Sequence, residues 1–164
     1  MTSLRILLAD DHALVRAGMR LLLERMADVQ VVGEADDGRK ALAALDVLQP
    51  DVLLMDIAMP GLSGLDAATR AAREHPRVKV VILSMHANEE YVLEAFRAGA
   101  AGYLLKESAV VELELALDAM RRGESYVSPA VSRAVIDAYL ARLSDGAGAS
   151  GEALTPRQRE ILTH

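Results

Sequence analysis

Short apolar runs that alternate with longer helical segments are the feature that most restricts how this chain can fold. Each run is continuously apolar and is followed by a segment whose apolar residues recur at helical spacing. The expected strands cover 4–9, 29–33, 51–55, 78–83 and 101–105. Such strands are buried on both faces, so the pattern predicts a parallel sheet with helices on each side. Right-handed crossovers make this a doubly wound α/β fold, and five units are too few for a closed eight-unit barrel.

Residues typical of helix ends support the expected helices. Ser63, Asn88 and Ser108 stand where side chains commonly cap helix N-termini, and Gly99 stands at a helix C-terminus. The expected helices cover 13–26, 38–48, 64–73, 88–99, 108–120 and 129–143.

The organisation changes after Gly123, and we divide the chain there. We expect one domain over 1–122, a linker with one helix over 123–151, and the truncated start of a further domain over 152–164. Ser128-Pro129 is typical of a helix start, and Ser144 to Gly151 has the composition of a flexible linker. The helix at 129–143 either packs on the first domain, which we favour slightly, or forms a dimer or signalling contact.

Composition excludes several classes of protein. The chain has no Cys, so it holds no disulfide and no thiolate metal or redox site. It has no run of about 18 apolar residues and starts without a signal segment, which predicts a cytoplasmic protein with no membrane contact. The formal net charge of −6 and the five aromatic residues (four Tyr and Phe96) argue against strong nucleic-acid binding by this chain alone.

Polar residues of complementary type follow four of the expected strands. In an open parallel sheet the binding crevice lies beyond the carboxyl ends of the strands. Those ends carry Asp10, Asp11, Asp56, Ser84 and Lys106. Neighbouring carboxylates repel one another unless a proton or a cation joins them, and an all-oxygen site suits Mg²⁺. Asp56 could then be a nucleophile toward phosphorus, with Lys106 and the Ser84 hydroxyl stabilising the phosphoryl oxygens.

These motifs resemble the receiver domain of two-component response regulators. The resemblance rests on Asp10-Asp11, on Asp56-Ile57-Ala58-Met59-Pro60-Gly61, on Ser84 and on Gly102-Tyr103-Leu104-Leu105-Lys106, and it covers about residues 3–122. The Gly-Tyr-Leu-Leu-Lys form and Ser84-Met85-His86 are similar to the NarL/FixJ subfamily. Residues 154–162 are similar to the opening of a LuxR-type helix-turn-helix domain whose recognition helix is absent, so DNA-binding residues stay unknown.

The resemblance implies a role for each of these residues in a flavodoxin-like receiver fold. Asp56 would be the phosphoacceptor, and Lys106 would hold the phosphate. The side chains of Asp10, Asp11 and Asp56, with the backbone carbonyl of Ala58, would bind Mg²⁺. Ser84 and Tyr103 would be the switch pair, with the hydroxyl moving toward the phosphoryl group and the ring following into the vacated space.

The resemblance also implies partners and an output. A sensor histidine kinase would supply the phosphoryl group, and phosphorylation would alter homodimerisation and DNA binding by the complete protein to regulate transcription. Candidate dimer surfaces are the first and fifth helices, or the face of the fourth helix, fifth strand and fifth helix. The chain would be a signalling phosphoacceptor, not a turnover enzyme, with self-phosphorylation and slow autodephosphorylation at most.

Three neighbouring residues bear on the switch and on hydrolysis. Met85 follows Ser84, and its bulk is expected to act as a brake on an inward Tyr103. Ala58 offers no polar group to orient a water that attacks the phosphate. His86 could orient that water, or it could be a partly exposed loop residue.

Other functions stay open from the sequence. The chain could be a stand-alone receiver or phosphotransfer relay, although such a module does not need the segment after Gly151. An aspartyl-phosphate phosphohydrolase generally has a second Asp two residues after the nucleophile, where this chain has Ala58. A flavin- or nucleotide-binding protein is disfavoured because no Gly-rich phosphate loop follows any expected strand.

Overall fold

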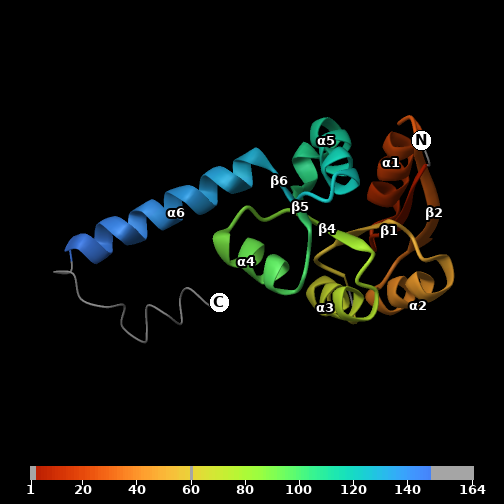
Figure 1. Ribbon diagram of the computed structural model, residues 1–164, viewed down its shortest axis with the longest axis horizontal. Coiled ribbons are helices and arrows are strands. Elements are labelled where there is room, and N and C mark those ends of the chain that lie inside the picture. Colours follow the sequence, from red (N-terminus) through yellow and green to blue (C-terminus); the bar gives the residue numbers. More distant parts are fainter. Residues whose placement is uncertain (1–2, 60, 149–164) are drawn as a thin grey trace.

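A six-stranded parallel sheet forms the centre of the computed structural model, which describes residues 3–59 and 61–148. The strand order is β2-β1-β3-β4-β5-β6, with helices on both faces (Figure 1). The strands are β1 (Leu4–Ala9), β2 (Val29–Ala35), β3 (Val52–Asp56), β4 (Lys79–Ser84), β5 (Gly102–Leu105) and β6 (Tyr126–Val127). The helices are α1 (Ala13–Glu24), α2 (Gly38–Leu48), α3 (Gly64–Glu74), α4 (Glu89–Arg97), the short 3-10 helix η1 (Lys106–Ser108), α5 (Ala109–Arg121) and α6 (Pro129–Gly148). The doubly wound α/β prediction is confirmed.

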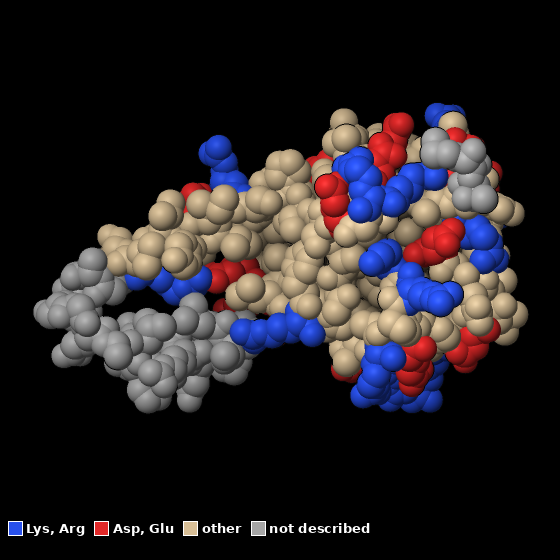
Figure 2. Space-filling view, viewed as in Figure 1, with Lys and Arg blue, Asp and Glu red and all other residues tan. Residues whose placement is uncertain are grey.

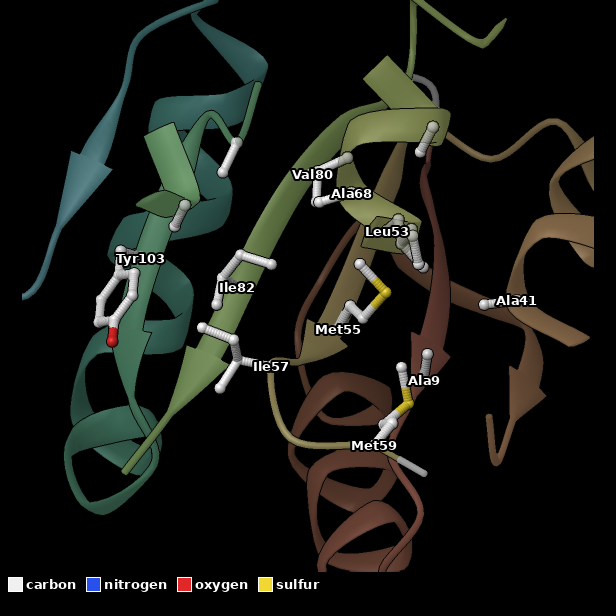
Figure 3. Packing of buried hydrophobic residues seen from close by; sticks show 14 of the residues in the cluster. Ala9, Ala41, Leu53, Met55, Ile57, Met59, Ala68, Val80, Ile82 and Tyr103 are labelled. Carbon is white, nitrogen blue, oxygen red and sulfur yellow. The ribbon is translucent and has the colours of Figure 1, made fainter. Parts of the chain in front are cut away.

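Two hydrophobic clusters, one on each face of the sheet, hold these layers together. Successive strand residues point to opposite faces, so Leu7 and Leu53 join one cluster while Leu8 and Leu54 join the other. Helices α2, α3, α4 and the start of α6 cover the first cluster, and α1 and α5 cover the second (Figure 1). Figure 3 shows side chains of the first cluster lying along β3, β4 and β5. The continuous apolar strands are therefore a consequence of burial on both faces.

The sixth strand was not expected from the sequence, which predicted five. Tyr126 and Val127 pair in parallel with Gly102 and Tyr103 of β5. Two residues are too short a run for a strand to be recognised by periodicity. This strand lies beyond residue 122, so the start of the expected linker is joined to the sheet.

Helix α6 is longer than predicted and leaves the body of the protein (Figure 1). Its first turns pack on the sheet, where Val131 is buried and Val135 packs against the first cluster. The helix continues to Gly148, so the expectation of a flexible linker is wrong for 144–148. Extending an existing helix costs far less than starting one, and Ala favours it, which offsets the Gly residues there. The predicted capping box at Thr155 lies outside the described residues.

Two of the predicted helix ends are confirmed in detail. The Ser63 hydroxyl accepts a hydrogen bond from the Asp66 N–H at 3.2 Å and caps α3. Gly99 follows α4 with φ of +103°, a conformation that glycine adopts readily. Within residues 3–59 and 61–148, no helix is both long enough and apolar enough to span a bilayer.

Gly64, the first residue of α3, allows that helix to approach the chain directly after β3. A Cβ atom at this position would lie 2.5 Å from the carbonyl oxygen of Asp56 and 2.6 Å from Cα of Ile57. Both neighbours are backbone atoms, which cannot move without shifting the end of β3. The absence of a side chain at Gly64 therefore helps to fix the position of Asp56.

We expect Gly64→Ala to lower the free energy of unfolding by about 2 kcal/mol or more, because the new methyl group meets fixed backbone. The matched control is Gly18→Ala in α1, where a Cβ would meet nothing within 4 Å. That change should instead stabilise the protein by about 0.5–1 kcal/mol, because Ala favours the helix interior. Urea denaturation of both variants measures the difference, and equal effects would contradict the packing argument.

Candidate functional site

The strand register brings the predicted residues to one edge of the sheet. Asp10 directly follows β1, Asp56 ends β3, Ser84 ends β4 and Lys106 directly follows β5. These strands are consecutive neighbours in the sheet, so residues distant in sequence meet at their carboxyl ends. This edge contains the point where the chain turns from one side of β1 to the other, the usual place for a binding crevice.

Asp10, Asp56 and Lys106 form a buried ionic group. The side chain of Asp10 is fully buried and that of Asp56 is almost so, while Asp11 is about one-quarter exposed. Lys106 Nζ lies 3.0 Å from Asp56 Oδ2 and 3.3 Å from Asp10 Oδ2. One ammonium group thus faces two buried carboxylates, with a third beside them, so the site carries an excess of negative charge.

The pKa directions follow from this excess. Burial raises the pKa of Asp56, assisted by the charge of Asp10 and opposed by Lys106 and the Ala58 N–H. Burial also opposes the charged form of Lys106, but the nearby carboxylates of Asp56 and then Asp10 outweigh it and raise the Lys106 pKa. A further positive charge at this edge would therefore favour ionised Asp56.

Three carboxylate oxygens are oriented as free ligands. Asp10 Oδ2, Asp11 Oδ1 and Asp56 Oδ2 are buried and receive no hydrogen bond, although the ammonium of Lys106 stands near two of them. The second oxygen of Asp56 accepts a hydrogen bond from the Ala58 N–H at 3.1 Å, which fixes the carboxylate. Unsatisfied buried oxygens are costly, and a hard divalent cation is the partner that suits them. The donor set therefore fits the cation expected from the sequence.

The predicted switch residues, Ser84 at the end of β4 and Tyr103 on β5, both contact the loop after β4. Tyr103 is fully buried on β5, beside Ile82 and Ile57 in Figure 3, and its hydroxyl donates to the His86 carbonyl at 2.6 Å. The His86 N–H in turn donates to Ser84 Oγ at 3.0 Å. Ser84 and Tyr103 are thus connected through the backbone of one residue.

Met85 differs from the expectation placed on it, whereas His86 matches the alternative of an exposed loop residue. Met85 is 80% exposed while Tyr103 is already inside, so Met85 does not restrict an inward ring, and the predicted brake is wrong. A loop residue can turn its side chain outward even when the residue before it, here Ser84, is buried. The His86 ring stacks on Tyr91 with centroids 4.4 Å apart, which favours a packing role over orientation of a water.

His12 is the residue that the sequence reasoning missed. Its Nδ1 atom lies 3.1 Å from Asp11 Oδ1, 3.4 Å from Asp10 Oδ1 and 3.9 Å from Asp56 Oδ2. Among the described residues, Asp10, Asp11, His12 and Asp56 form a group able to hold a metal ion. The available signal was its position directly after Asp10-Asp11, at the start of α1.

Comparisons with known proteins agree with this geometry. Residues 6–118 match the model of the response regulator receiver domain. The chain belongs to the response regulator receiver family. The transcriptional regulatory protein YxjL of Bacillus subtilis is 40% identical over 160 residues, which cover 97% of this chain and 73% of YxjL.

Solved structures of relatives have the same fold. A two-component response regulator of the LuxR family from Aurantimonas sp. SI85-9A1 has a TM-score of 0.81 and 34% identity, covering 85% of this chain and 99% of that one. RcsB, solved as two dimers bound to two parallel DNAs, has a TM-score of 0.76 and 30% identity, covering 82% of this chain and 68% of that one. This receiver is therefore homologous to NarL/LuxR-type two-component regulators of transcription.

Without divalent cations at pH 7.5, we expect Asp56→Asn to raise Tm by about 3 °C, because it removes a buried charge beside Asp10. Folding raises the pKa of Asp56, so the folded protein holds this proton more readily than the unfolded chain. In the wild type, the destabilisation caused by ionised Asp56 is therefore complete above the pKa of Asp56 in the folded protein. It disappears as the pH falls through that pKa. Thermal unfolding in a chelator at pH 7.5 and at pH 5 tests both parts.

Asp118→Asn is the matched control for this measurement. Asp118 is exposed on α5, and its replacement should change Tm by less than about 1 °C at either pH. A lower Tm for Asp56→Asn than for the wild type would show that Asp56 stabilises the cation-free fold.

Proposed function

We propose that Asp56 accepts a phosphoryl group from a sensor histidine kinase with Mg²⁺, and that phosphorylation changes dimerisation and DNA binding by the complete regulator. The observation that carries this proposal is the buried group of Asp56, Asp10 and Lys106, with carboxylate oxygens left free of hydrogen bonds. Asp10 and Asp56 are each held by a backbone N–H and by the ammonium of Lys106, which lies closer to Asp56, at 3.0 Å against 3.3 Å.

The phosphoryl transfer uses groups that are already in place. A carboxylate oxygen of Asp56 forms a bond to phosphorus, the donor's P–N bond breaks, and the donor nitrogen takes a proton. Lys106 Nζ then stabilises a phosphoryl oxygen as it did the carboxylate. The cation, held by Asp10, Asp11, Asp56 and the Ala58 carbonyl, would supply positive charge that keeps Asp56 ionised.

A surface pocket beside Asp56 gives the donor a place to enter. It has a volume of about 500 Å³ and is lined by His12, Val15, Met85, Lys106 and Glu107. The exposed Met85 side chain gives its rim an adaptable apolar surface. These features suit a partner protein that presents a phosphorylated histidine between apolar side chains.

The residue two positions after Asp56 argues against repeated hydrolysis of phosphate esters, the activity of a phosphohydrolase. Ala58 occupies the position where aspartyl-phosphate hydrolases generally carry a second acid, and its side chain has no group to protonate a leaving oxygen. The proposed activity is therefore that of a signalling phosphoacceptor with slow autodephosphorylation.

The switch would begin at the Ser84 hydroxyl. Turning that hydroxyl toward the phosphoryl group removes the acceptor of the His86 N–H, and the His86 carbonyl also holds Tyr103. A shift of this loop moves the start of α4, where Glu89 makes a two-pronged ion pair with Arg142 of α6. Phosphorylation would thus reach the helix that leads toward the expected DNA-binding segment.

The dimer surface that the exposed side chains support best is the face of α1 and α5. Both helices cover the same face of the sheet (Figure 1). Large apolar residues are exposed on them: Leu14, Leu21, Val110, Val111 and Leu115. The solved RcsB dimers on DNA support a dimeric output in a relative. The cytoplasmic location stays a prediction from the sequence.

We expect Asp56→Asn to abolish labelling by a small phosphodonor such as acetyl phosphate with Mg²⁺, because an amide is not a nucleophile toward phosphorus. Asp118→Asn should be labelled as the wild type is. Intact-protein mass spectrometry measures the added phosphoryl group, and circular dichroism confirms that both variants fold. Undiminished labelling of Asp56→Asn would remove Asp56 from its proposed role.

We expect beryllium fluoride with Mg²⁺ to shift the chain from monomer to dimer, because this anion occupies the position of the phosphoryl group. Leu115→Glu should block the shift by placing a charge in the apolar contact. Leu140→Glu, an equally exposed leucine on α6, is the control that should still dimerise. Sedimentation velocity measures the change, and loss of dimerisation only in Leu140→Glu would assign the contact to α6.

A further inference from the structure

His12 stands at the start of α1, yet its side chain is not used to cap that helix. The residue occupies the N-cap position with extended backbone, and its imidazole makes no capping hydrogen bond. The side chain is 62% exposed, and its Nδ1 atom lies toward the three acids. Of these acids, Asp11 is partly exposed, whereas Asp56 and Asp10 are buried. The imidazole is therefore available for a role in the acidic site.

The contact between His12 and Asp11 is not a hydrogen bond. Nδ1 lies 3.1 Å from Asp11 Oδ1, but that oxygen is buried and receives no hydrogen bond. The short distance and the missing hydrogen bond together are what two ligands of one cation would show.

The distances fit a single coordination sphere. Metal–ligand distances of about 2.1–2.2 Å place neighbouring ligand atoms of an octahedral ion about 3 Å apart and opposite ones about 4.3 Å apart. Nδ1 lies 3.1 and 3.4 Å from oxygens of Asp11 and Asp10, and 3.9 Å from Asp56 Oδ2. One ligand atom from each of these residues lies within 4.8 Å of all the others. A cation bound by the three acids is thus within reach of the imidazole.

Building on the cation site of the proposed function, we propose that His12 Nδ1 is a direct ligand and that the site selects a first-row transition cation such as Mn²⁺ over Mg²⁺. Imidazole nitrogen is a better ligand for the first-row transition cations, of which Mn²⁺ binds most weakly, than for Mg²⁺, which prefers oxygen ligands and keeps its waters. His12 would therefore determine metal specificity, while the carboxylates would determine that a cation binds at all.

The test compares Mn²⁺ and Mg²⁺ binding by the full chain and by His12→Ala. We expect the wild type to bind Mn²⁺ at least about tenfold more tightly than Mg²⁺, and the variant to lose about tenfold in Mn²⁺ affinity while its Mg²⁺ affinity changes less than about twofold. Electron spin echo spectroscopy of bound Mn²⁺ should show coupling to a directly bound ¹⁴N in the wild type, and none in His12→Ala.

His75→Gln is the matched control, because this histidine pairs with Asp46 away from the acidic site and should leave the ¹⁴N coupling and both affinities unchanged. An imidazolium that only neutralised the acids would compete with any cation, so tighter binding of both metals by His12→Ala would overturn the proposal. Wild-type binding of both metals without ¹⁴N coupling would also overturn it and leave the phosphoacceptor role intact. Binding of neither metal, with Asp56 labelled in their absence, would overturn the cation site itself.

Discussion

The burial of negative charge at the carboxyl ends of β1 and β3 is the constraint on which the rest of the structure depends. Asp10 and Asp56 are removed from water and share the ammonium of Lys106, which cannot neutralise both. The apolar sheet stabilises the fold strongly enough to hold them there. An edge of this kind gains from any positive charge that offsets the carboxylates, so the site is sensitive to what binds it.

This edge is connected to α6 by two separate routes. One runs from Ser84 through His86 to α4 and on through the ion pair of Glu89 with Arg142. The other runs through Ser128, whose buried hydroxyl accepts the Leu105 N–H beside Lys106. Both routes use hydrogen bonds and ion pairs, which form or break in discrete steps. Beyond them α6 carries a half-exposed apolar stripe of Ile136, Tyr139, Leu140 and Leu143, and Figure 2 shows much of this helix uncharged on the visible side.

Sequence periodicity predicted strands β1 to β5 well, but it missed the edge strand β6 and the true end of α6. Strands β1 to β5 were recognisable because burial on both faces demands continuous apolar runs. β6 was missed because Tyr126 and Val127 form a strand only by pairing with β5. The end of α6 was misjudged because glycine content suggested flexibility, whereas a helix already fixed by Val131 extends at little cost. In each case the deciding interaction comes from outside the segment.

The sequence alone determined the chemistry available to this protein: a parallel sheet, and Asp10, Asp11, Asp56, Ser84 and Lys106 at the ends of its strands. Chain direction suffices for that, because parallel strands bring their carboxyl ends to the same edge. Only the tertiary structure decided which atoms meet. The imidazole of His12 turns toward the acids, Met85 turns away from Tyr103, and one carbonyl of His86 receives the tyrosine hydroxyl. Side-chain direction in loops follows from packing between distant segments, and a local pattern does not contain it.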